Sequence, residues 1–197
     1  LLVATVDTKH DEAMFLKQSI KRLGCNVLIM NPSPLTSPPY PVDIDRDEIA
    51  RASGEDIEEL VASGDKGRCI GAMMTGVGII AKNMYEKGLF QGIVSIGGDQ
   101  GTNIGTSAMR ALPFGVPKFM VSTVATGQAK FGEYTRTKDI IIMHSVADIQ
   151  GLNRVTRSVM WKAAVSISAL VREGEIEMPV GEKKIPIAFS MLGTTTR

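Results

Sequence analysis

The sequence has few of the residues that support a metal centre or a disulfide framework. Among its 197 residues are two histidines and two cysteines, so a histidine-rich metal site is not expected. Cys25 and Cys69 both stand in apolar surroundings, which predicts buried, reduced thiols of the kind found in cytoplasmic proteins. No apolar run approaches the length of a membrane-spanning helix, and no signal peptide is recognised. We therefore expect a cytoplasmic protein that does not associate with a membrane.

The sequence also lacks an excess of charge of one sign. Lys and Arg number 22 and Asp and Glu number 21, for a formal net charge of +1. Direct binding to nucleic acid is not expected, since it depends on a strongly basic surface. The sequence also lacks a nucleophile elbow and a paired-carboxylate signature. His144, with Asp148 nearby, is a candidate general base, but a structural role is favoured for it, and catalysis is left unassigned.

What the sequence does contain is a regular alternation of short apolar runs with helical patterns. The apolar runs, each predicted to form a buried strand, lie at 1–6, 27–30, 92–96, 118–122 and 139–143. Amphipathic spacing predicts helices at 10–23, 66–87, 103–112 and 155–170, with two short helices in 47–63 that break at Gly54. Uniformly apolar strands between helices predict an α/β fold. We expect a doubly wound, Rossmann-like, mostly parallel sheet with helices on both faces.

The segment 66–87 allows two interpretations. Apolar residues recur through it at helical spacing, which favours one long helix. The alternative makes 73–78, which holds two glycines, a second glycine loop after a strand. In a helix, the glycines of this segment would let a neighbouring backbone pack closely.

A glycine-rich run follows the central strand. Gly97, Gly98 and Gly101 are three glycines within five residues, and Thr102 comes next. Glycine lets a ligand approach the backbone, and the start of a helix offers unpaired N–H groups that suit an anion such as phosphate. Thr102 is expected to add a hydroxyl at the helix cap. The alternative is a tight turn with close packing of strand on helix. Asp99 is unfavourable for a phosphate unless its carboxylate points away, binds a metal or binds a sugar hydroxyl.

Two other strand-end loops carry polar residues that would meet the glycine loop, because ligands of parallel sheets sit beyond the carboxyl ends of the strands. Lys9 could contact a phosphate as a point charge, and Asp7 could hold a ribose hydroxyl or hydrated Mg²⁺. Ser122 and Thr123 could donate hydroxyl hydrogen bonds. Each also has an ordinary structural explanation. A loop with five prolines within 32–41 could form one wall of the site.

Three motifs together resemble a known family. They are VDTK at 6–9, IGGDQGT at 96–102, and GVPK at 115–118 leading into VSTVA at 121–125. In this combination the chain resembles the family of uncharacterised proteins that includes the N-terminal domain of the tomato mosaic virus resistance protein. The resemblance implies two Rossmann-like domains, ATP binding and a homodimer. It also implies, for the plant member, inhibition of viral RNA replication through contact with the viral replication protein.

Carried over by motif, the resemblance implies a set of nucleotide-binding residues. They are Asp7, Thr8, Lys9, Gly97, Gly98, Gly101, Thr102, Ser122 and Thr123. It also implies a nucleotide-binding domain at 1–184 and the start of a truncated second α/β domain at 185–197.

Three functions therefore stay open. The first is a nucleotide-binding domain of a two-domain protein, with ATP as ligand, with or without Mg²⁺. The second is an enzyme acting on a small phosphorylated or carboxylated metabolite, whose site a second domain completes. The third is a dimeric interaction module in which the nucleotide is structural.

Overall fold

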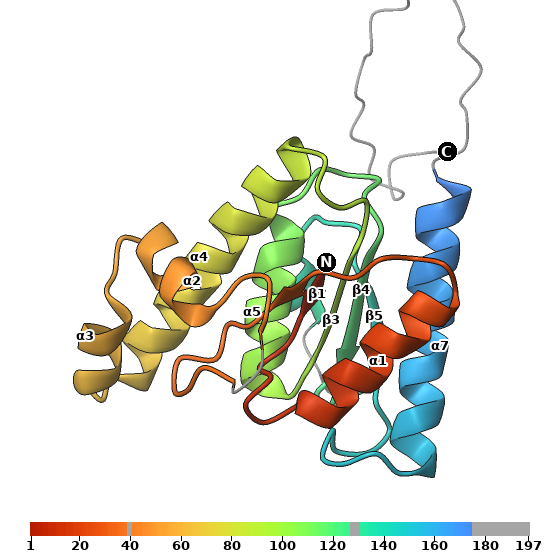
Figure 1. Cartoon of the computed structure of the whole chain (residues 1–197), viewed down its shortest axis with the longest axis horizontal. Coiled ribbons are helices and arrows are strands. Elements are labelled where there is room, and N and C mark those ends of the chain that lie inside the picture. Colours follow the sequence, from red (N-terminus) through yellow and green to blue (C-terminus); the bar gives the residue numbers. More distant parts are fainter. Residues whose placement is uncertain (39–40, 127–130, 175–197) are drawn as a thin grey trace, which may run out of the picture.

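The structure, a computed structural model, describes residues 1–38, 41–126 and 131–174. The predicted start of a second domain at 185–197 lies outside the described residues. Within them, a central sheet is covered by helices on both faces (Figure 1). The expected α/β architecture is confirmed.

The sheet has five strands, and all of its pairings are parallel. They are β1 (Leu2–Val3), β2 (Ile29–Met30), β3 (Ile93–Gly97), β4 (Lys118–Ser122) and β5 (Ile141–His144), in the spatial order β2-β1-β3-β4-β5. The chain winds outward from β1 to β2 and then returns to the other side of β1. The boundary between β1 and β3 is therefore the topological switch point, where doubly wound sheets open a crevice for ligands.

The first strand is shorter than the apolar run that predicted it. The run extends over 1–6, but β1 ends at Val3 because the chain turns soon afterwards. The N–H groups of Thr8 and Lys9 both donate to the carbonyl of Thr5, at 3.2 and 3.0 Å. This turn brings 5–9 to the carboxyl edge of the sheet.

Helices cover the two faces of the sheet with separate apolar cores. Helices α1 (His10–Arg22) and α7 (Arg154–Glu173) cover one face, and α2 (Arg46–Ala52), α4 (Lys66–Glu86) and α5 (Asp99–Arg110) cover the other (Figure 1). Two short helices, α3 (Ile57–Ala62) and α6 (Phe131–Thr135), complete the described elements. Alternate strand residues serve opposite cores: Ile93 packs with α4 and α5, whereas Val94 packs with α1 and α7. Within the described residues, no helix is both long and apolar enough to cross a bilayer.

The long-helix interpretation of 66–87 is confirmed, and the alternative glycine loop at 73–78 is wrong. Helix α4 runs without interruption from Lys66 to Glu86. Gly76 lies against the backbone of Ile49 in α2, so the close approach expected of a helical glycine occurs there. Gly71, in contrast, faces open space.

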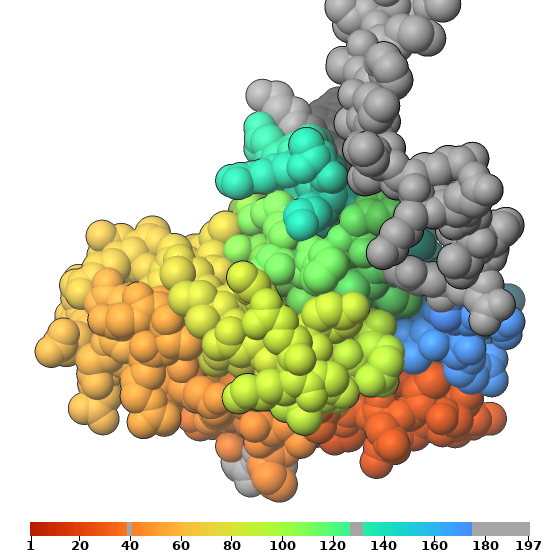
Figure 2. All heavy atoms as spheres, turned by 90° about the horizontal axis from the view of Figure 1, so that it is seen from above, coloured from red at the N-terminus to blue at the C-terminus, as the bar shows by residue number. Residues whose placement is uncertain are grey.

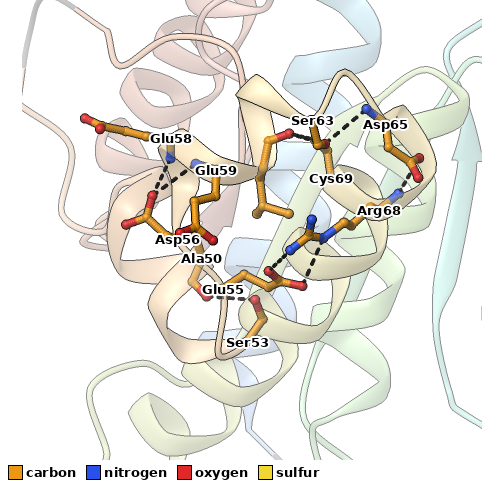
Figure 3. A network of polar contacts seen from close by, with 11 residues as sticks. Ala50, Ser53, Glu55, Asp56, Glu58, Glu59, Ser63, Asp65, Arg68 and Cys69 are labelled. Carbon is orange, nitrogen blue, oxygen red and sulfur yellow. Dashed lines mark hydrogen bonds and ion pairs between the residues drawn. The ribbon is translucent and has the colours of Figure 1, made fainter.

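The corner formed by α2, α3 and the start of α4 is held by local caps and one ion pair (Figure 3). The break at Gly54 is as predicted, with a left-handed φ of 84°. Asp56 caps α3 by accepting from the N–H groups of Glu58 and Glu59, at 2.8 and 3.1 Å. Asp65 caps α4, and Arg68 pairs with Glu55 at 2.6 Å. The caps join residues two or three positions apart, and the Arg68–Glu55 pair joins residues thirteen positions apart.

The two cysteines differ in burial. Cys69 is buried in this corner, as predicted, and its thiol donates to the carbonyl of Leu60 at 3.2 Å. Cys25 is only partly buried, so the expectation that both thiols are buried is wrong for this one. It follows α1, where the chain turns at Gly24 with a left-handed φ of 86°.

Candidate functional site

A cavity of about 670 Å³ opens at the switch point, beyond the carboxyl ends of β1 and β3. Its volume lies in the range of small-molecule sites. Four segments form it: the loop from β1 to α1, the loop after β2, the junction of α3 with α4, and the first turn of α5. The lining residues are Thr5, Asp7, Thr8, Lys9, Ser33, Pro34, Leu35, Val61, Gly64, Lys66, Cys69, Ile70, Gly98, Asp99, Gln100 and Gly101.

The β1–α1 loop brings three of the predicted residues to the cavity. Asp7, Thr8 and Lys9 all line it. One carboxylate oxygen of Asp7 accepts from the N–H of Thr8 at 2.8 Å, which orders the turn. Lys9 is the residue before α1, and its side chain is partly exposed. An ammonium group is therefore available at the wall of the cavity.

The glycine run forms the start of α5 rather than a free loop. The helix begins at Asp99, four residues before the predicted 103, and its cap is Gly98. The first intrahelical donor is the N–H of Thr102, which reaches the carbonyl of Gly98 at 2.8 Å. The N–H groups of Asp99, Gln100 and Gly101 precede it and have no intrahelical acceptor. They lie where the positive end of the helix dipole meets the cavity.

The expectation that Thr102 caps this helix is wrong. Its hydroxyl is buried and donates to the carbonyl of Gly98 at 2.7 Å, so it accepts from the hydroxyl of Ser122, which lies 2.7 Å away. These two hydroxyls join α5 to the end of β4 beneath the glycine run. Neither Thr102 nor Ser122 lines the cavity.

Thr123 stands on the same side as Ser122, behind the glycine run. Its N–H donates to the carbonyl of Gly97 at 3.2 Å. Its hydroxyl oxygen lies 3.6 Å from where a Cβ on Gly98 would be. The predicted pair Ser122 and Thr123 therefore supports the helix start and does not face the β1–α1 loop across the cavity.

The three glycines lie in two different surroundings, and the structure shows the close packing of strand on helix at one of them. A Cβ on Gly97 would lie 2.6 Å from the Cα of Gly101, which only glycine avoids. Gly97 thus allows strand and helix to pack closely. Gly98 and Gly101 line the cavity, and a Cβ on Gly101 would meet no atom closer than 3.5 Å.

Asp99 is engaged on one side of α5. Its Oδ1 accepts from the hydroxyl of Tyr134 at 3.3 Å and from the side-chain amide of Asn103 at 3.4 Å. Burial and the nearby Asp99 carboxylate raise the pKa of the Tyr134 hydroxyl, so this group stays protonated and able to donate. These two uncharged donors hold the carboxylate on that side of α5, although Asp99 still lines the cavity.

Part of the cavity is apolar, and the share of it that comes from α3 and α4 was not predicted. Pro34 and Leu35 come from the proline-rich loop that was expected to form a wall, and Val61 and Ile70 come from α3 and α4. Leu35 is 68% exposed and Val61 is 40% exposed. Exposed apolar side chains at a cavity are typical of a surface that a ligand covers. Lys66, also not predicted, adds a second ammonium group to the lining.

In the described part of the chain, no three side chains of His, Cys, Asp or Glu gather as a metal-ligand set. His144 ends β5 and is partly buried, and it does not line the cavity.

Comparison with known proteins agrees with the resemblance. Residues 1–175 match the uncharacterised protein family (UPF0261) N-terminal domain. The chain is 34% identical over its whole length to a UPF0261 protein of Clostridium tetani and 35% identical over 99% of its length to one of Mesorhizobium japonicum. It covers 48% and 47% of those proteins, so it spans about half the length of these curated relatives. It is also 28% identical to the ToMV susceptible protein tm-1(GCR26) of Solanum lycopersicum, over 98% of this chain and 28% of that protein. The chain therefore belongs to the UPF0261 family and corresponds to its N-terminal domain.

Proposed function

We propose that this chain is a nucleotide-binding domain, with ATP as the nucleotide and the cavity at the β1–β3 switch point as its site. One observation carries the proposal: Lys9, Lys66 and the unpaired N–H groups at the start of the twelve-residue α5 line the same cavity as an exposed apolar wall. A nucleotide has both an anionic and an apolar part. The choice of ATP among nucleotides is inferred from the family resemblance alone.

The lining suggests how a nucleotide would lie. Its phosphates would meet the N–H groups of 99–101 and the two lysines. Its base would cover Leu35 and Val61. The carboxylate of Asp7 would be left for a ribose hydroxyl or for a hydrated Mg²⁺ ion. Thr102 and Ser122 would act from behind by fixing the helix start.

A second candidate function is the binding of a small phosphorylated or carboxylated metabolite by an enzyme. It is favoured by the length of the relatives, because the rest of such a protein could supply catalytic groups that the cavity does not offer. The third function, an interaction module with a structural nucleotide, stays a prediction. The homodimer and the cytoplasmic location also stay predictions.

Thermal unfolding with a panel of ligands tests the proposal. ATP, ADP, GTP, NAD, inorganic phosphate and sugar phosphates would be compared, each with and without Mg²⁺. ATP at one hundred times its Kd is expected to add about 2.7 kcal/mol to the free energy of unfolding. A shift only with sugar phosphates would favour the metabolite enzyme, and no shift with any nucleotide would contradict the proposal.

Lys66→Gln is expected to weaken ATP binding by about tenfold, the effect of losing one charged hydrogen bond. Lys66 is the first residue of α4, where its positive charge opposes the helix dipole. The ligand-free variant should therefore be as stable as the parent chain or slightly more so. Lys162→Gln, an exposed position on α7, serves as the control and should leave the ATP shift unchanged. Equal ATP affinity in both variants would remove Lys66 from the site.

A further inference from the structure

A groove between α4 and α5 holds three cationic side chains away from the switch-point cavity. Its volume is about 510 Å³, and its lining includes Lys82 from α4, Arg110 from the end of α5, and Arg136 just after α6. Arg110 ends the helix whose first turn faces the cavity, so the two sites lie at opposite ends of α5. Figure 2 shows this side of the molecule from above, with the teal segment of α6 beside the green of α5.

Arg110 is fixed in the groove by neutral partners. Its Nη1 donates to the hydroxyl of Thr106 at 3.0 Å and to the carbonyl of Tyr134 at 2.7 Å. Burial, and then the charge of Arg136, lower the pKa of Arg110. Neither guanidinium forms an ion pair within the described residues. Two neighbouring positive charges therefore lack a counter-ion there.

The third cation is free to turn toward a ligand. The ammonium nitrogen of Lys82 lies 3.9 Å from a carboxylate oxygen of Glu86, and the two side chains are 58% and 60% exposed. An exposed pair at this distance contributes little, so Lys82 can exchange it for another anion.

The other polar groups of the groove are already engaged. The hydroxyl of Ser107 donates to the carbonyl of Met74 at 2.9 Å, and that of Thr75 donates to the carbonyl of Gly71 at 2.9 Å. Gly71 also leaves open space above the helix. The groove therefore offers room and unneutralised positive charge.

We propose that Lys82, Arg110 and Arg136 form a second anion site, which binds a phosphoryl group as free phosphate or as a monoester. The planar guanidinium group presents several N–H donors that match the oxygens of a phosphoryl group. Two guanidinium groups beside an ammonium group suit a dianionic phosphoryl group better than they suit a single carboxylate. The site is independent of the nucleotide site, because none of its three cations lines the switch-point cavity.

Calorimetric titration at constant ionic strength tests this site, with inorganic phosphate, glycerol phosphate and succinate as ligands. The titrations would use the Lys66→Gln variant, in which anion binding at the switch-point cavity is weakened. Arg136→Asn is expected to weaken phosphate binding at least about tenfold. It should fold, because Arg136 is exposed and asparagine accepts its left-handed φ of 48° more readily than most residues. Lys162→Gln serves as the charge-matched control.

The outcomes separate the two proposals. Stronger binding of glycerol phosphate than of phosphate supports a monoester ligand, and equal binding supports free phosphate. Binding of succinate alone, or phosphate binding that Arg136→Asn leaves unchanged, overturns the second site. The ATP shift of the parent chain should persist in Arg136→Asn, so loss of the nucleotide site would be seen separately.

Discussion

Gly76→Ala is expected to destabilise the chain by about 3 kcal/mol or more, the cost of forcing atoms into a packed interior. A Cβ at this position would lie 2.0 Å from the carbonyl oxygen of Ile49 and 2.8 Å from its Cγ2. The nearest atom belongs to the backbone of α2, so the whole helix has to move before the methyl group fits. Urea denaturation of the variant and the parent chain would measure the loss.

Gly71→Ala is the matched control, on the same helix five residues earlier. A Cβ there would meet no atom within 4 Å. Alanine favours the helix over glycine by about 1 kcal/mol, so this variant should be more stable than the parent chain. The same substitution in one helix thus has opposite expected signs. Destabilisation of similar size at both positions would contradict the argument from close packing.

Lys118→Met is expected to lower the free energy of unfolding by about 3–5 kcal/mol, as is typical when one partner of a buried ion pair is removed. The side chain of Lys118 has no exposed surface. Its Nζ donates to the carbonyls of Pro113 and Val116, at 2.7 and 2.8 Å, and to Asp139 at 2.8 Å. The substitution leaves three acceptors without this donor. Lys138→Met, which removes a single bond to the carbonyl of Leu112, is the control and should cost less.

The ion pair of Lys118 with Asp139 makes the stability of the chain depend on pH. Burial alone would raise the pKa of Asp139, but hydrogen bonds from Lys118 and from the N–H of Gly115 lower it below 3.8. Because the folded pKa is the lower one, the pair's contribution is complete above about pH 4 and is lost as the pH falls through the folded pKa. The penalty of Asp139→Asn should therefore be constant near neutral pH and shrink in acid. A penalty that stays constant down to about pH 3 would contradict it.

The fold was predictable because its strands are apolar and its helices keep their period. The strand at 118–122 was placed with its observed bounds, and the helix at 66–87 to within one residue. The start of α5 was missed because glycine disfavours helices, so 97–102 resembled a loop. Packing of Gly97 against Gly101 overrides that local preference and starts the helix at Asp99.

The candidate site was predictable only where a strand end fixes it. Residues 7–9 and the glycines at 98 and 101 follow strands that meet at the switch point, and they line the cavity. Ser122 also follows a strand, but its side chain turns inward to Thr102, and sequence alone does not determine that direction. The contribution of Val61 and Lys66 depends on how α3 packs against α2 and α4, which no local sequence pattern determines.

The locally capped corner around α3 has a consequence for motion. Helix α3 is six residues long and contributes Ile57 and Leu60 to the apolar core. The other contacts of this corner are the helix caps and the Arg68–Glu55 ion pair, which lie within the corner itself. Such a segment can open without unfolding the sheet, so its amide hydrogens should exchange with deuterium long before those of β3. Val61 and Gly64 line the cavity, so a ligand bound there would hold α3 in its closed position and slow the exchange of its amide hydrogens.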